Sequence, residues 1–181
     1  GLVEHFSGEK NKISSFLINK KTFIIAKVNE KKCSKKDLDN ILKKACNIIK
    51  TEKKIVNVNF ILAPIKDFIR YQILKVIHHN YFFIKYKDSK TTTKKITFCV
   101  VNKLKKTVLN SIKEGEIIND MRDMVNEPGN IMNSEYFLEY VKTFKETGLK
   151  LEIMKKSKLK KEKMNLILAV NSGSKNEPYL L

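Results

Sequence analysis

Short β-branched segments alternate with longer amphipathic segments along the first hundred residues. Apolar, β-branched runs at residues 22–28, 55–62 and 95–101 predict three strands. Apolar residues at 3.6-residue spacing predict two helices between them, one through Leu38, Ile41, Leu42, Ala45, Ile48 and Ile49 and one through Ile65, Phe68, Ile69, Ile73, Val76 and Ile77. Ser34, with Asp37 three residues on, predicts a capping box at the start of the first helix. The alternation predicts an α/β fold with helices packed on a largely parallel or mixed sheet.

A long helical pattern follows from Leu104 to Val125, and it ends where Pro128 removes a backbone donor. Ser134 then predicts the cap of another helix, and Gly148 its C-terminal end. The other predicted elements are a strand at 149–154, a short basic helix at 156–163, a buried strand at 165–170, a turn at 172–174 and a strand that starts at Tyr179. A second βαβ region therefore begins near residue 105, and we expect its sheet to need strands beyond Leu181.

The chain is strongly basic, with 37 Lys and Arg residues against 19 Asp and Glu and a formal net charge of +18. All the basic residues are Lys except Arg70 and Arg122. Proteins that grip phosphates or guanine edges usually use the planar fork of Arg, so the Lys excess favours a coding bias spread over solvated faces. A lysine cluster at residues 155–161 keeps a polyanion-binding surface as the alternative.

The same composition restricts the compartment and the kind of site. No apolar run approaches the roughly 18–20 residues that a membrane helix needs, so we expect no membrane partner. Cys33, Cys46 and Cys99 form no Cys-x-x-Cys pair, which argues against a structural zinc site and fits a reducing compartment. We therefore expect a cytoplasmic protein.

Few side chains are candidates for chemistry. His78 and His79 point about 100° apart on a helix, so they cannot converge on one metal, and we interpret them as a helix-end pair near solvent. Cys99 lies in an apolar strand and is more typical of a small buried residue than of a nucleophile. Ser172 and Ser174 flank a glycine without forming the Gly-x-Ser-x-Gly turn of a hydrolase.

Carboxylates gather near the end of the long helical pattern at Asp120, Asp123 and Glu127. We interpret them as solvated charges that partner Arg122 and lysines rather than as metal ligands. The chain contains neither a Gly-rich phosphate loop nor a His-Glu-x-x-His motif. Taken residue by residue, the sequence therefore predicts no active site.

A longer motif nevertheless gives a resemblance. Residues 119–132, which include Arg-Asp-Met-Val-Asn-Glu-Pro-Gly-Asn, resemble the "ARDLVNEPxN" stretch that opens the catalytic domain of leucyl (cytosol) aminopeptidases. Residues 134–138 are similar to the family's next helix, with Glu135 where proline is usual. Residues 148–153 resemble its "GLKVEV" strand, and residues 166–178 its "LLAVGxGS…PP" segment, with Asn171 in place of a glycine. Residues 82–87 are similar to a weaker signature that closes the N-terminal domain.

The resemblance implies a hydrolase, an exopeptidase that releases N-terminal residues, Leu especially, from peptides. In this family two divalent ions, Zn²⁺ or Mn²⁺, share the attacking water and stabilise the oxyanion. The family's metal ligands lie in the motifs "VGKGxxFDxGG", "DMGG" and "NTDAEGRL", and none of these occurs in residues 1–181. We therefore expect no catalytic, cofactor-binding or metal-binding residue in this chain, no bound metal, and no activity of the chain alone.

The resemblance also implies a domain organisation. Residues 1–104 would form a macrodomain-like N-terminal α/β domain with a mixed sheet, and residues 105–181 the linking helix and the truncated beginning of an α/β catalytic domain. The expected assembly is a homohexamer in the cytoplasm. The alternative hypothesis is a Lys-rich α/β module that binds nucleic acid or acts as an assembly scaffold, since some bacterial members bind DNA through the N-terminal domain.

Overall fold

The computed structural model describes residues 13–18, 21–26, 33–52, 57–62, 68–87, 94–99 and 102–181. The chain divides into two compact units, residues 1–121 (unit 1) and residues 122–181 (unit 2). The boundary falls inside one long helix, α4 (Lys105–Asn126). The predicted domain division at 104/105 places this helix as the link, and it stays a prediction.

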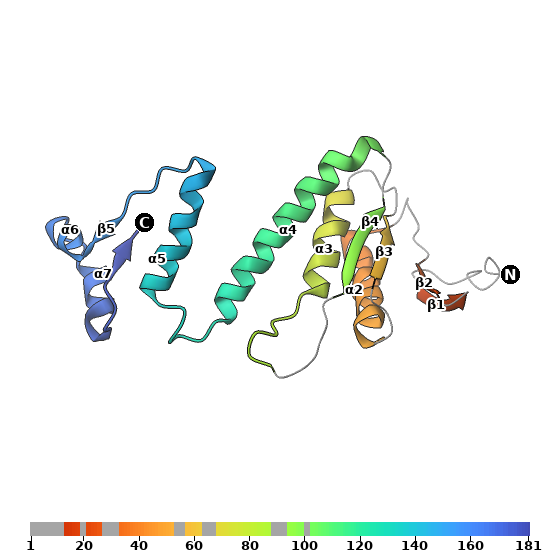
Figure 1. Ribbon diagram of the computed structural model, residues 1–181, viewed down its shortest axis with the longest axis horizontal. Coiled ribbons are helices and arrows are strands. Elements are labelled where there is room, and N and C mark those ends of the chain that lie inside the picture. The colour runs from red at the N-terminus through yellow and green to blue at the C-terminus, as the bar shows by residue number, and fades with distance from the viewer. Residues whose placement is uncertain are drawn as a thin grey trace. The chain divides into compact units, whose positions relative to one another are not determined.

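Unit 1 contains the alternating strands and helices that the sequence predicts and one further strand, at residues 13–18, that it does not predict (Figure 1). They are β1 (Ile13–Ile18), β2 (Lys21–Ala26), α2 (Lys35–Thr51), β3 (Asn57–Ile61), α3 (Ile69–Asn80), β4 (Lys95–Cys99), a short 3-10 turn (Asn102–Leu104) and α4. The capping box at α2 is confirmed: Ser34 Oγ accepts a hydrogen bond from Asp37 N, and the Asp37 carboxylate accepts one from Ser34 N, both at 3.1 Å. Ile65 lies outside the described residues, and α3 begins at Ile69.

The strands form two separate pairs in the described part of unit 1. β1 pairs antiparallel with β2, whereas β3 pairs parallel with β4 in the register Asn57↔Lys95 to Ile61↔Cys99. Successive side chains of β3 and β4 alternate between exposed and partly buried, as expected for a pair covered on one face. The predicted α/β class is confirmed, with parallel and antiparallel pairing both present.

Helices α2, α3 and α4 supply most of the core of unit 1. In one cluster, Leu38, Leu42 and Cys46 of α2 meet Val76 of α3. In the other cluster, Ile69 and Ile73 of α3 meet Val108 of α4 and Leu62, which directly follows β3. Phe60 of β3 and Phe98 of β4 pack against both clusters, with their ring centroids 6.1 Å apart. The inward face of the β3–β4 pair therefore joins the two clusters into one core.

One expectation about this strand pair is wrong. The sequence predicts that Cys99 is a small buried residue, but it is exposed. The reason is its register: Ile96 and Phe98 occupy the inward positions of β4, so Thr97 and Cys99 face outward. A continuous apolar run does not by itself reveal which of its alternate side chains meet the core.

Helices α3 and α4 approach closely at Gly115. A Cβ atom at this position would lie 2.6 Å from Cδ1 and 3.1 Å from Cγ2 of Ile77, closer than a packed side chain tolerates. Arg70 of α3 also forms a bidentate ion pair with Glu114, its Nε donating at 2.8 Å. A side chain at residue 115 would therefore force Ile77 to shift, which makes this position a close contact between the two helices.

Unit 2 contains short elements after α4. They are α5 (Ser134–Thr143), a 3-10 turn (Phe144–Thr147), β5 (Met154–Lys155), α6 (Lys156–Lys161), α7 (Asn165–Val170), a 3-10 turn (Asn171–Gly173) and β6 (Tyr179–Leu180). β5 and β6 pair antiparallel through Met154↔Leu180 and Lys155↔Tyr179. Gly148 has a φ of 86°, which confirms it as the left-handed residue that ends the preceding helical segment.

Three local predictions for unit 2 need correction. The cap of α5 is Asn133, whose Oδ1 accepts hydrogen bonds from Glu135 N and Tyr136 N, while Ser134 Oγ donates to Glu177 O at 2.6 Å. The strand expected at 149–154 is confined to Met154–Lys155, because β6 offers only two pairing residues. Residues 165–170 form helix α7 instead of a buried strand.

The error at α7 has a physical cause. A short apolar run is compatible with a buried strand or with a helix, and the Leu and Ala residues of this run favour the helix. The helix is also largely solvent-exposed: Leu166 is 85% exposed and Val170 is 89% exposed. The apolar sequence of this segment therefore predicts a buried element, but no residue of α7 is buried in the described structure.

Candidate functional site

The two histidines lie in the last turn of α3, where one of them joins an ion-pair cluster with α2. His79 Nε2 is 2.8 Å from Asp39 Oδ1, and Lys75 Nζ is 3.2 Å from the same oxygen. The His79 side chain is only 13% exposed. The ring of His78 meets that of His79 edge-on, with centroids 5.3 Å apart. The cluster connects α2 to α3, and a single carboxylate oxygen holds it together.

Asp39 was not among the residues singled out from the sequence, although a signal existed. Lys75 and His79 are four residues apart, so they share one face of α3. Two basic side chains on one face are stabilised by a carboxylate nearby, and this spacing indicates that one should lie there. Burial raises the pKa of Asp39, but the bonds from His79 and Lys75 outweigh burial and hold that pKa below its ordinary value.

Replacing Asp39 with asparagine is expected to lower the free energy of unfolding of unit 1 by about 1 kcal/mol, because the ionic bonds between α2 and α3 become weaker. Because the pKa of Asp39 is lowered by folding, the stabilisation is present above the unfolded-state pKa and is lost as the pH falls through the folded-state value. Urea unfolding from pH 7 to about pH 3 tests this. The difference between the parent chain and Asp39→Asn should become smaller towards the acidic end, and a pH-independent difference would contradict the assignment.

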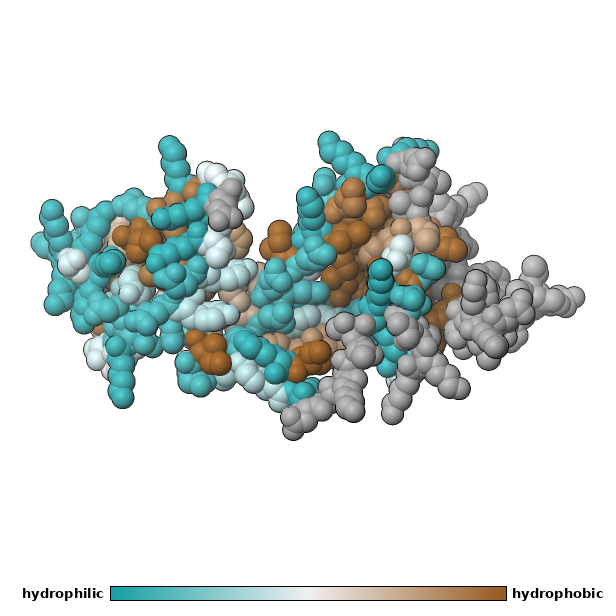
Figure 2. Space-filling view, viewed as in Figure 1, coloured by the Kyte–Doolittle hydropathy of each residue, from teal (hydrophilic) through white to brown (hydrophobic). Residues whose placement is uncertain are grey.

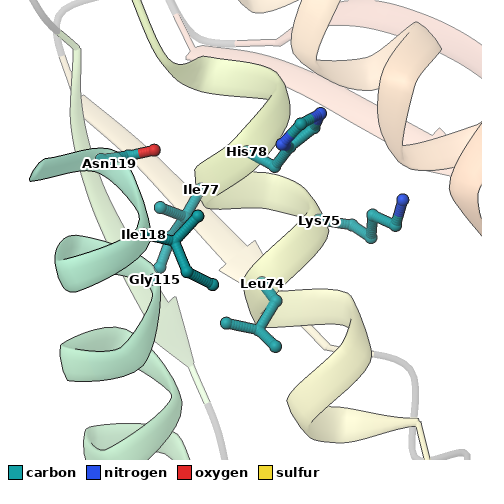
Figure 3. A pocket seen from close by; sticks show the side chains of 7 residues that line it. All are labelled: Leu74, Lys75, Ile77, His78, Gly115, Ile118 and Asn119. Atoms are coloured by element: carbon teal, nitrogen blue, oxygen red, sulfur yellow. The ribbon is translucent and has the colours of Figure 1, made fainter. Parts of the chain in front are cut away.

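A hollow of about 150 Å³ lies beside this cluster, between α3 and α4 (Figure 3). Its lining residues are Leu74, Lys75, Ile77, His78, Gly115, Ile118 and Asn119. Ile77 and Ile118 face one another between the helices, whereas the polar ends of Lys75 and His78 point away from them (Figure 3). None of these seven lining residues has a carboxylate. We interpret it as a packing gap at the Gly115 crossing rather than as a ligand site.

The other candidates do not form a catalytic arrangement. Ser174 Oγ accepts a hydrogen bond from Asn176 N at 3.1 Å, which is typical of a turn. Asp120 and Asp123 are exposed on α4, and Glu127 follows the end of that helix. Burial raises the pKa of the Cys46 thiol to about 11, so this thiol is unreactive at neutral pH.

A two-metal centre needs several converging oxygen or nitrogen ligands. Within the described ranges, no group of three or more His, Cys, Asp or Glu side chains could hold a metal ion. The described residues therefore do not fit such a centre, and no catalytic step is assigned to them. No helix in the described part of the chain is long and apolar enough to cross a membrane.

Comparisons with known proteins place the chain in a family. Residues 119–181 match the model of the cytosol aminopeptidase family, catalytic domain. A probable cytosol aminopeptidase from Persephonella marina is 32% identical over 163 residues, which cover 81% of this chain and 33% of that protein. The chain belongs to the cytosol aminopeptidase family. The matched segment begins at the motif that carries the resemblance, which is thereby confirmed.

Two further cytosol aminopeptidases are similar to parts of the chain. The probable enzyme of Phytoplasma mali is 32% identical over 66% of this chain and 25% of its own length, and the enzyme of Haemophilus influenzae is 33% identical over 62% and 24%. The chain thus spans about a quarter to a third of the length of these three relatives.

A solved structure shows the same fold. A mutant of tomato leucine aminopeptidase aligns with a TM-score of 0.69 and 17% identity, covering 98% of this chain and 38% of that one. Both compact units therefore have counterparts in an aminopeptidase structure.

Proposed function

We propose that this chain is part of a metal-dependent aminopeptidase that releases N-terminal residues, Leu among them, from peptides. The observation that carries the proposal is the match of residues 119–181 to the catalytic-domain model of a peptidase family. Residues 1–104 would form the macrodomain-like N-terminal domain, and residues 105–181 the linking helix and the first part of the catalytic domain. The complete enzyme would bind two Zn²⁺ or Mn²⁺ ions and assemble as a cytoplasmic homohexamer.

The catalytic centre would be built from residues outside residues 1–181. The support is that the three ligand motifs of the family are absent from the sequence and that the described carboxylates and histidines do not converge. The chain's own residues would provide the scaffold on which that centre forms. None of them is proposed to contact the substrate.

The purified chain is expected to show no hydrolysis of leucine p-nitroanilide above the buffer rate at any Mn²⁺ or Zn²⁺ concentration. The cytosol aminopeptidase of Haemophilus influenzae serves as the positive control in the same assay. Turnover by the chain that is lost on adding a chelator would contradict the proposed absence of metal ligands.

A chimera tests whether this chain can serve as part of an active aminopeptidase. This chain replaces the matching third of the Persephonella marina relative, and chelator-sensitive hydrolysis of leucine p-nitroanilide is expected. Circular dichroism and the oligomeric state establish whether the chimera is folded. A folded, metal-loaded chimera without hydrolysis would contradict the assignment of this chain to the aminopeptidase scaffold.

A further inference from the structure

Six lysines lie within nine residues of unit 2, in and around α6. We call them the lysine knob: Lys155, Lys156, Lys158, Lys160, Lys161 and Lys163. All six are exposed, whereas Leu159 between them is 0% exposed and fixes the helix to unit 2. Lysines make up 35 of the 181 residues, so nine residues with average composition would contain fewer than two. Figure 2 shows hydrophilic side chains gathered over this part of unit 2.

Carboxylates neutralise only part of the lysine knob. Lys158 pairs with Glu152 at 2.5 Å, and Lys156 lies 3.8 Å from a carboxylate oxygen of Glu177. The other four lysines have no carboxylate oxygen within 4 Å in the part of unit 2 that the structure describes. They are Lys155, Lys160, Lys161 and Lys163. Glu162 also lies within these nine residues, so the six lysines together with Glu152, Glu162 and Glu177 carry a formal net charge of +3.

Two features of the lysine knob oppose stability, although Lys156 and Lys158 are each paired with a carboxylate. Lys156 and Lys160 are four residues apart on α6, and Lys158 and Lys161 are three apart, so like charges face each other along the helix. Lys163 has a φ of 53°, in the left-handed region where Gly or Asn is less strained than Lys. A bound polyanion would relieve the charge repulsion.

We propose that the lysine knob binds the phosphate backbone of nucleic acid without sequence preference. An ammonium group acts as a point charge, so lysines can neutralise successive phosphates without the fixed geometry that Arg provides for base edges. The proposal goes beyond peptidase activity and assigns the binding surface to unit 2 rather than to the N-terminal domain.

Other polyanions fit the lysine knob less well. An anionic membrane surface is normally bound by a helix that also inserts an apolar face, but α6 has six residues and its buried Leu159 is unavailable for insertion. An acidic peptide would offer carboxylates in place of phosphates, and competition by polyglutamate tests it as an outcome.

The test is fluorescence anisotropy of the full chain with a labelled 20-bp duplex DNA and a matching duplex RNA. Binding of either duplex is expected at 50 mM salt, and the tighter of the two identifies the preferred nucleic acid. If four phosphates are neutralised, the binding constant for DNA should fall about 100-fold between 50 and 200 mM salt.

The variant replaces Lys155, Lys160 and Lys161 with Gln and Lys163 with Asn. It should bind DNA at least about 10-fold more weakly at 50 mM salt and reduce the slope of log K against log salt by about 3–4. The matched control removes four exposed lysines of unit 1, by Lys43→Gln, Lys44→Gln, Lys106→Gln and Lys113→Gln. Because both variants carry the same net charge, the control should retain most of the binding and the slope.

Several results would overturn the proposal. They are no binding at 50 mM salt, binding that does not depend on salt, an equal loss in the knob variant and the control, and equal competition by polyglutamate or by anionic phospholipid vesicles. Circular dichroism of both variants verifies that helix content is unchanged. The four knob side chains make no ion pair in the described structure, so the variant is expected to fold.

Discussion

Replacing Ile73 with alanine is expected to lower the free energy of unfolding of unit 1 by about 2–5 kcal/mol. The Ile73 side chain is 0% exposed and lies in the cluster that joins α3 to α4 and to the β3–β4 pair. Truncation removes buried methyl groups and leaves a cavity that the two helices can fill only partly, because Gly115 already brings them into close contact. Urea unfolding followed by far-UV circular dichroism measures the change.

The matched control for Ile73 is the same substitution at Ile61. Ile61 is the last residue of β3 and is 85% exposed, so Ile61→Ala should change the free energy of unfolding by less than about 0.5 kcal/mol. Amide hydrogen exchange of α3 provides an independent reading of local stability in both variants. Equal effects of the two substitutions would show that the outward face of β3 is covered in solution.

Replacing Leu159 with alanine is expected to have a comparably large effect on unit 2, also about 2–5 kcal/mol. Leu159 is 0% exposed, and few other apolar residues of unit 2 are buried, Met124 and Leu138 among them. The loss should appear as faster amide exchange throughout α6. It should also weaken any nucleic-acid binding by the lysine knob, because Leu159 holds the lysine-bearing helix in place.

The matched control for Leu159 is Leu166→Ala on α7. Leu166 is 85% exposed, so its truncation should leave amide exchange in unit 2 unchanged within about 0.5 kcal/mol. A large loss at Leu166 would contradict the exposed position of α7 and would show that another surface covers this helix in solution.

Local signals predicted the helices of unit 1 well. The capping box of Ser34 and Asp37 and the apolar stripe of α2 depend on spacings within one helix, and both are present in the structure. Predictions based on burial were less accurate. The apolar runs that contain Cys99 and residues 165–170 both indicated buried strands, but Cys99 faces outward and α7 is an exposed helix.

The candidate sites show the same difference. Geometry on a single helix predicts that His78 and His79 do not converge on one metal, and this stays a prediction. It could not identify Asp39 as the partner of His79, because the two residues are 40 positions apart and meet only when α2 packs against α3. The lysine knob was visible in the sequence, but the number of its charges left without a carboxylate was not.

The sequence by itself determined the alternation of elements, the helix start at Ser34, the end of the α5 segment at Gly148 and the family motif around Pro128. These depend on neighbours a few residues away, through backbone hydrogen bonds and helix periodicity. Only the tertiary structure decided which apolar side chains are buried, that Asp39 joins His79 and Lys75, and that Gly115 is a contact point between helices. Burial and ion pairing depend on atoms from distant parts of the chain, and their positions are fixed only when the elements pack together.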